Sequence, residues 1–231
     1  MSHTGNARGV EGADACDAYV FMGGTFDPIH HGHLRTALEL QQWLGVDQVW
    51  LVPSRTPPHR DAPGTTSEQR LEMVRLAVAD EPALGVDDRE VRSDRPSYSL
   101  LTLRSLRQEL GAERPLCMVL GMDAYLGLPS WHGWEELIGL CHIIVVRRPG
   151  YIYEPQATMG RFTRAHETTS LAAVLGMPCG RVLMHELTPL SISATQIRQL
   201  VARGLSPRYL CPDPVWHYIQ QHRLYGLNEG S

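Results

Sequence analysis

Short, continuously apolar segments alternate with helix-like stretches along this chain of 231 residues. The strand-like segments are residues 18–22, 49–52, 85–91, 116–120, 143–146 and 182–187, and most of them are apolar throughout. Helical spacing predicts helices at 32–44, with Gly45 as its C-terminal cap, and at 98–110, 132–140, 193–203 and 212–224. A further helix is predicted from 67 onward, with Ser67 as its N-cap. A strand that is apolar throughout is typical of a parallel sheet covered on both faces. We therefore expect an α/β fold, a doubly wound parallel sheet between two layers of helices.

The chain contains no long linker, internal repeat or low-complexity segment. We expect one domain over residues 18–231, preceded by a flexible polar segment at 1–17, with an irregular excursion at 150–170. No window approaches the ~18 apolar residues of a membrane span, and the start lacks the apolar stretch of a signal peptide. A soluble protein without membrane contact is expected.

Composition excludes several kinds of chemistry. All 21 residues counted as lysine or arginine are arginines. Schiff-base lysines, the P-loop lysine and the protein-kinase lysine are therefore ruled out. A net charge of −4 offers no basic field for nucleic acid, so no nucleic-acid partner is expected. Five cysteines without a CxxC pair, two of them inside apolar segments, indicate a reduced, cytoplasmic compartment.

The loop after the first predicted strand, residues 23–34, starts with two adjacent glycines and carries Pro28 and three histidines. Glycines let a backbone approach a ligand closely, and the helix that starts near His31 would point its free amides and positive end outward. His30 and His33 are three residues apart, so both imidazoles would lie on one side of that helix start. Phosphate binding is favoured. A polar turn and a metal site built from His30, His31 and His33 are the alternatives, the latter without further ligands at a zinc spacing.

A second helix start follows the last predicted strand, at residues 192–198. Ser193 suits an N-cap, and Thr195 and Arg198 lie within the first turn and a half. Taken alone, these residues are more often a cap and a solvated arginine. Two anion-suited helix starts in one α/β fold favour a shared phosphate site.

These two segments resemble the HxGH and SxTxxR signatures of the nucleotidylyltransferase superfamily. Five further segments narrow the resemblance to the nicotinate-nucleotide adenylyltransferase family: residues 53–60, 96–99, 121–123, 128–131 and 146–150. The resemblance covers roughly residues 19–222, and it implies a Rossmann-like fold. It also implies transfer of the adenylyl group of ATP, with Mg²⁺, to nicotinate mononucleotide in NAD biosynthesis.

The resemblance implies a role for each matching residue. His30, His33 and Arg198 would be catalytic and would hold the ATP phosphates. The other residues expected at ATP are Gly24, Thr25, Phe26, Asp123, Arg148, Ile192, Ser193 and Thr195. The residues expected at the mononucleotide are Arg60, Tyr98, Ser99, Trp131 and His132. Trp131 would stack on the nicotinate ring, and the backbone amide of His132 would meet the ring carboxylate.

Two positions depart from the family pattern. Arg60 stands where the family often has lysine, which keeps the charge but changes its shape and reach. Ser99 stands where threonine is usual, and its hydroxyl is retained. Rival readings are an adenylyltransferase for nicotinamide mononucleotide or another phosphorylated acceptor, and a nucleotide-binding regulator without catalysis. A fragment of a class I aminoacyl-tRNA synthetase is disfavoured because the lysine-bearing signature of those enzymes cannot exist here.

Overall fold

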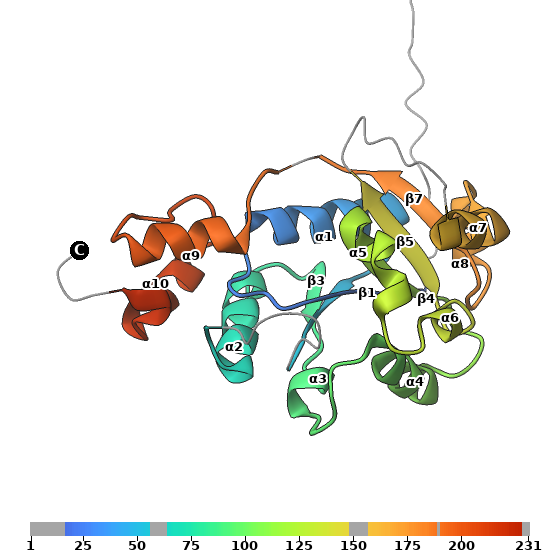
Figure 1. The fold of residues 1–231 in the computed structure, drawn as a ribbon, viewed down its shortest axis with the longest axis horizontal. Coiled ribbons are helices and arrows are strands. Elements are labelled where there is room, and N and C mark those ends of the chain that lie inside the picture. The colour runs from blue at the N-terminus through green and yellow to red at the C-terminus, as the bar shows by residue number, and fades with distance from the viewer. Residues whose placement is uncertain (1–16, 56–63, 148–156, 189, 228–231) are drawn as a thin grey trace, which may run out of the picture.

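The computed structural model describes residues 17–55, 64–147, 157–188 and 190–227 (Figure 1). Its strands are β1 (Tyr19–Gly24), β2 (Val49–Pro53), β3 (Leu84–Val86), β4 (Leu116–Gly121), β5 (His142–Arg147), β6 (Glu167–Thr168) and β7 (Val182–Glu186). Its α-helices are α1 (His31–Leu44), α2 (Ser67–Val78), α3 (Arg89–Arg92), α4 (Ser99–Leu110), α5 (Met122–Leu126), α6 (Trp134–Leu137), α7 (Ala157–His166), α8 (Leu171–Leu175), α9 (Ala194–Ala202) and α10 (Asp213–Gln221). Two 3₁₀ turns complete the list, η1 (Leu128–Ser130) and η2 (Leu224–Gly226).

The strands form one parallel sheet in the order β3-β2-β1-β4-β5-β7-β6. β1 lies near the centre, where Met22 pairs with Leu51 of β2 on one side and with Val119 of β4 on the other. The strand order reverses between β1 and β4, and in open α/β sheets ligands bind outside the carboxyl ends of the strands at such a point. The predicted doubly wound sheet is confirmed.

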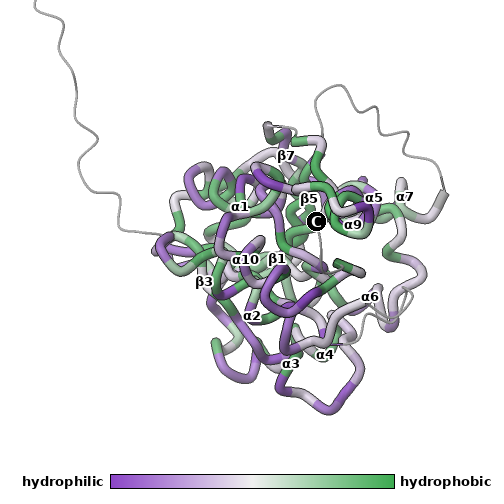
Figure 2. Tube along the Cα trace, turned by 90° about the vertical axis from the view of Figure 1, so that its left-hand side faces the viewer, coloured by the Kyte–Doolittle hydropathy of each residue, from purple (hydrophilic) through white to green (hydrophobic). Residues whose placement is uncertain are grey.

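Side chains alternate between two cores along each central strand. Val20 and Met22 of β1 face a cluster with α1, α2, α8, α9 and α10, whereas Tyr19 and Phe21 face a cluster with α4, α5, α6 and α7. This alternation follows from the two-residue repeat of a strand. Figure 1 shows α9 and α10 at one end of the molecule and α7 and α8 at the other. In Figure 2 the chain through β5 is green, and the turns around α3 are mostly purple.

The predicted strand at 85–91 is wrong beyond Val86. β3 stops there, and Arg89–Arg92 form the short helix α3. The Asp87 carboxylate accepts the backbone N–H of Arg89 at 3.0 Å, which closes an Asx-type turn. Asp87 and Asp88 therefore end the strand and turn the chain away from the sheet, and the charged Arg89 and Glu90 follow.

Two helix boundaries also differ from the prediction. Of the predicted helix at 132–140 only Trp134–Leu137 is α-helical, and Gly133 before it has a φ of 64°. The N-cap of α2 is Thr66 rather than Ser67, because Thr66 and Gln69 form a reciprocal capping box. The expected excursion at 150–170 contains α7 and β6 in its described part. An edge strand of two residues leaves little signal in a sequence.

Cys117 and Cys141 are buried among apolar side chains, as predicted. None of the helices in the described ranges is long and apolar enough to cross a bilayer. Residues 1–16 lie outside the described part of the chain, so the division into a flexible segment 1–17 and a domain at 18–231 stays a prediction. The cytoplasmic location also stays a prediction.

Candidate active site

The loop that leaves β1 folds back over the end of its own strand. Phe26 is buried, with a φ of 50°. Its ring lies so close to Gly24 that a Cβ at residue 24 would sit 2.9 Å from the ring. Glycine is therefore required at position 24, as expected for a loop whose backbone must approach a neighbour closely.

His30 and His33 stack on one another at the start of α1. Their ring centroids are 3.7 Å apart with an interplanar angle of 18°, and the edge of Phe26 meets His33 at 5.0 Å. His30 is the N-cap residue of α1, in extended backbone conformation. The prediction that both imidazoles lie on the same side of the helix start is confirmed.

Burial makes His30 a neutral imidazole at physiological pH. Its side chain is only 5% exposed, and burial lowers its pKa to about 4. Nδ1 of His30 has no hydrogen-bond partner within the described part of the chain. Because a neutral imidazole can donate through one nitrogen and accept through the other, His30 offers a ligand a polar atom without a fixed charge.

One backbone amide expected to be free at the start of α1 is occupied. The N–H of His31 donates to the carbonyl of Leu210 at 3.0 Å, from the loop between α9 and α10. The helix dipole still points to the loop, but this donor cannot also bind a phosphate. The expectation of free first-turn amides is wrong at His31, because the C-terminal part of the chain caps this helix.

The second predicted segment lies against the first. Arg198 on α9 donates through Nη1 to the carbonyl of Asp27 at 2.7 Å and through Nη2 to the Thr195 hydroxyl at 3.3 Å. Ser193 caps α9 by accepting the N–H of Gln196 at 3.1 Å, as predicted. A Cβ added to Gly32 would stand 3.6 Å from the carbonyl oxygen of Ile192. We call the combined surface of residues 24–33 and 192–198 the cradle.

Asp27 and Arg70 support the cradle, and neither is among the predicted site residues. The Asp27 carboxylate accepts hydrogen bonds from the Thr65 hydroxyl at 2.6 Å and the Tyr225 hydroxyl at 2.7 Å. Arg70 is fully buried and donates to the Thr25 carbonyl at 2.7 Å. Its signal in the sequence is a charge on the helix face of Met73 and Val74, three and four residues further on, where an apolar residue is expected.

The predicted mononucleotide residues form a second group, the acceptor cluster of Tyr98, Ser99, Trp131 and His132. The rings of Tyr98 and His132 stack with centroids 4.7 Å apart. Trp131 ends η1 and packs against the apolar cluster of α4 and α5. The N-cap of α4 is Tyr98, so Ser99 opens that helix. An aromatic surface at a helix start suits a flat, anionic ring.

Backbone contacts join the acceptor cluster to the cradle. The N–H of Ser54, just after β2, donates to the Gly24 carbonyl at 2.9 Å. The N–H of the next residue, Arg55, donates to the Ser97 hydroxyl at 2.9 Å, directly before Tyr98. The two predicted groups therefore lie along one continuous line of contacts at the carboxyl edge of the sheet.

Three further predicted residues complete the account. Asp123 is exposed in the first turn of α5, directly after β4 and hence at the reversal of strand order. Arg60 and Arg148 lie outside the described residues. In the ranges that the structure describes, no group of three or more His, Cys, Asp or Glu residues could hold a metal ion.

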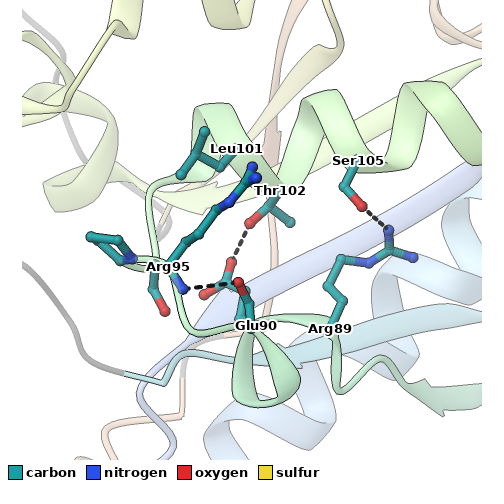
Figure 3. Close-up of a pocket in the computed structure, with 9 residues that line it drawn as sticks. Arg89, Glu90, Arg95, Leu101, Thr102 and Ser105 are labelled. Atoms are coloured by element: carbon teal, nitrogen blue, oxygen red, sulfur yellow. Dashed lines mark hydrogen bonds between the residues drawn. The ribbon is translucent and has the colours of Figure 1, made fainter.

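A cavity of about 170 Å³ lies between α3 and α4, behind the acceptor cluster's loop (Figure 3). Glu90 lines this cavity, and its carboxylate accepts a hydrogen bond from the Thr102 hydroxyl at 2.6 Å. Burial raises the pKa of Glu90. Arg89 donates to Ser105 at 3.2 Å on the far wall. Ser97 also lines this cavity, and none of the predicted site residues that the structure describes does. The cavity therefore lies beside the loop that precedes Tyr98, and it is separate from the cradle.

Comparisons with known proteins agree with this geometry. The family model described as cytidylyltransferase-like matches residues 21–200. A protein of Hahella chejuensis named "Probable nicotinate-nucleotide adenylyltransferase" is 50% identical over 208 residues, covering 90% of this chain and 95% of that protein. A Pseudomonas putida protein of the same name is 49% identical over 204 residues, covering 88% of this chain and 93% of its own length.

Solved structures share the fold. Nicotinic acid mononucleotide adenylyltransferase of Plasmodium falciparum, complexed with NaAD, aligns with a TM-score of 0.67 at 19% identity over 92% of this chain and 98% of its own. A Vibrio parahaemolyticus structure titled as a nicotinate-nucleotide adenylyltransferase aligns with a TM-score of 0.58 at 15% identity over 92% of this chain and 97% of its own. At 49–50% identity over 88–90% of its length, the chain belongs to the nicotinate-nucleotide adenylyltransferase family, within the cytidylyltransferase-like proteins.

Proposed function

We propose that the cradle and the acceptor cluster together transfer the adenylyl group of ATP to nicotinate mononucleotide, which gives nicotinate adenine dinucleotide and pyrophosphate. One observation carries this proposal. Arg198 reaches from α9 to the Asp27 carbonyl at 2.7 Å, in the loop whose end carries the stacked His30 and His33. A fixed cation and two imidazoles therefore face the same helix start, which suits a polyphosphate.

The reaction needs no nucleophile from the protein. A phosphate oxygen of the mononucleotide attacks the α-phosphorus of ATP, and a new oxygen–phosphorus bond forms. The bond between that phosphorus and the bridging oxygen of the leaving pyrophosphate breaks in line. Because both reactants are anions, catalysis consists of alignment and of stabilising the charge that develops on the leaving group.

The catalytic roles then follow from the charge state of each group. Arg198 stays protonated at any physiological pH and binds the leaving phosphates. His30 and His33 donate to phosphate oxygens, and an anion beside His30 favours its protonated form. The backbone of Gly24, Thr25 and Phe26 lies along the nucleotide. Ile192, Ser193 and Thr195 hold the same phosphate chain from the α9 side.

The acceptor roles are assigned by the resemblance and supported by the aromatic cluster. Trp131 stacks on the nicotinate ring, and the backbone N–H of His132 donates to the ring carboxylate. Tyr98 and Ser99 line the mononucleotide at the start of α4. Asp123 binds a ribose hydroxyl. The remaining members, Arg60 at the mononucleotide and Arg148 at a phosphate of ATP, belong to the proposal on sequence grounds.

In this proposal Mg²⁺ binds to the site together with ATP, as a complex with the ATP phosphates. Mg²⁺ prefers hard oxygen ligands and keeps several waters, so it commonly binds through substrate phosphates with few protein carboxylates. Bound there, it would neutralise part of the charge on the leaving pyrophosphate. The cradle's own contribution is the fixed geometry of His30, His33 and Arg198 around the phosphates.

An acceptor comparison tests the function. The purified chain is incubated with ATP and Mg²⁺ together with nicotinate mononucleotide, nicotinamide mononucleotide or no acceptor, and pyrophosphate release is measured. We expect release with the acid well above both other reactions. Release that does not exceed the reaction without acceptor would reject the proposal, and faster turnover of the amide would reassign the substrate.

A further inference from the structure

Arg70 is a buried cation whose bonds join the two halves of the site. Its side chain on α2 is fully buried, and it donates through Nη1 to the carbonyls of Thr25 at 2.7 Å and Ser54 at 2.6 Å. Nη2 donates to the carbonyl of Arg55 at 2.7 Å. One guanidinium therefore holds the loop after β1 and the end of β2 at a fixed separation.

The two segments held by Arg70 serve the two substrates. Thr25 belongs to the cradle, next to Phe26. Arg55 donates its own N–H to Ser97, whose neighbour Tyr98 opens the acceptor cluster. The separation of these segments therefore sets the distance between the bound mononucleotide and the α-phosphorus of ATP.

The three hydrogen bonds described for the Arg70 guanidinium all go to backbone carbonyls. Within the described residues no salt bridge joins it to a carboxylate, and its Nε has no hydrogen-bond partner. Burial lowers the pKa of Arg70, but a guanidinium remains protonated in proteins. A buried cation without a directly paired carboxylate is costly to keep, and the Asp27 carboxylate offsets part of that cost at longer range. Beneath a loop that binds a polyphosphate, the same charge favours the ligand.

We propose that Arg70 is a positioning residue, which aligns the two substrate loops through its three carbonyl bonds and places a positive charge behind the phosphates. The inference rests on the proposed function and deepens it. Lysine cannot replace this arginine, since its single ammonium lacks the planar fork that reaches carbonyls in the segments after β1 and β2. The side chain touches neither substrate, so it acts on turnover through the backbone of Thr25, Ser54 and Arg55.

The test uses Arg70→Lys, with Arg107→Lys as the matched control. Arg107 also binds several carbonyls, those of Leu140, Arg114 and Pro178 among them, but it lies away from the site. We expect Arg70→Lys to lower kcat by about 10²-fold, as a misalignment of about 1 Å does. Its dissociation constants for ATP and nicotinate mononucleotide should rise far less. At assay temperatures below the melting temperature of the variant, Arg107→Lys should have the same kcat as the parent.

Hydrogen exchange supplies a readout that does not depend on turnover. Arg70→Lys should exchange faster at residues 24–30 and 53–55, and Arg107→Lys at 111–116 and 177–180 instead. Arg70→Gln, which keeps two donors without the charge, undergoes the same measurements if the lysine variant does not fold. A parent-like kcat with parent-like exchange in both loops would overturn the proposal, and so would an equal loss of kcat in Arg107→Lys. If the parent chain itself releases no pyrophosphate, the proposed function fails, while the exchange comparison still decides the role of Arg70.

Discussion

At the scale of single residues, arginine has two structural roles in this chain, which contains no lysine. Some arginines form exposed ion pairs, such as Arg104 with Glu136 at 2.6 Å. Others bind backbone carbonyls that secondary structure leaves without partners. Arg107 donates through Nε to Leu140 at 2.7 Å, through Nη1 to Arg114 at 2.7 Å and through Nη2 to Pro178 at 2.6 Å. A planar fork with five donors makes this possible.

We predict that Arg107→Lys lowers the free energy of unfolding by about 1–3 kcal/mol, because carbonyls held by one guanidinium lose their partner. Urea unfolding followed by circular dichroism measures the change. Arg104→Lys is the control, since an exposed ion pair contributes at most about 1 kcal/mol. Equal stability losses in the two variants would contradict the distinction drawn between these arginines.

His33→Ala should lower turnover by about 10²–10³-fold, the usual effect of losing one preorganised donor. The fold should persist, because His33 lies in the first turn of α1 and belongs to neither apolar core. Pyrophosphate release and the melting temperature are measured together. His222→Ala removes an exposed imidazole at the end of α10 and should leave turnover unchanged. Near-normal turnover of His33→Ala would remove this residue from the catalytic set.

At the scale of elements, helix starts were the most predictable part of the site. Ser193 was recognised as an N-cap because a hydroxyl before an apolar helical pattern has a local physical cause. The C-cap at Gly45, with a φ of 66°, was recognisable for the same reason. Short elements such as α5 and α8 were not foreseen, since five residues carry too little periodicity and tertiary packing decides their form.

Ser193→Ala should cost about 1 kcal/mol of unfolding free energy, the usual value of a lost N-cap. It should also lower turnover, because α9 carries Arg198 to the Asp27 carbonyl. Ser170→Ala is the matched control: Ser170 caps α8 by accepting the N–H of Ala173 at 3.2 Å. That variant should lose similar stability while keeping the parent's turnover. Loss of turnover in both variants would show that stability alone is responsible.

At the scale of the whole molecule, two buried histidines couple folding to protons. His142 accepts the N–H of Arg181 at 3.1 Å through Nδ1, and its Nε2 lies 2.8 Å from the Met177 carbonyl. This arrangement requires a neutral ring that donates from Nε2. Burial lowers the pKa of both His142 and His30, the latter to about 4.

The free energy of unfolding should therefore fall as the pH is lowered from 6.5 towards 4. In this window the unfolded chain binds protons that the folded chain excludes, and the stabilisation is complete above pH 6.5. His30 alone accounts for up to about 3 kcal/mol. Urea unfolding across this window measures the slope.

His142→Gln keeps a donor and an acceptor but does not titrate, so its slope should be smaller than the parent's. The comparison also separates the contribution of His142 from that of Glu90. The raised pKa of Glu90 makes the free energy of unfolding rise, rather than fall, as the pH is lowered. An unchanged slope in His142→Gln would contradict the assignment to this residue.

The sequence by itself determined the sheet, its covering helices and the two helix starts of the cradle, because periodicity and capping are local properties that neighbouring residues specify. It also placed the family, through residues that match its motifs one by one. Tertiary structure alone decided that Arg198 meets the Asp27 carbonyl, that Leu210 occupies an amide of α1, and that Arg70 lies beneath the loop. These contacts join residues 45 to 179 positions apart, and no local pattern encodes which carbonyl a distant guanidinium will reach.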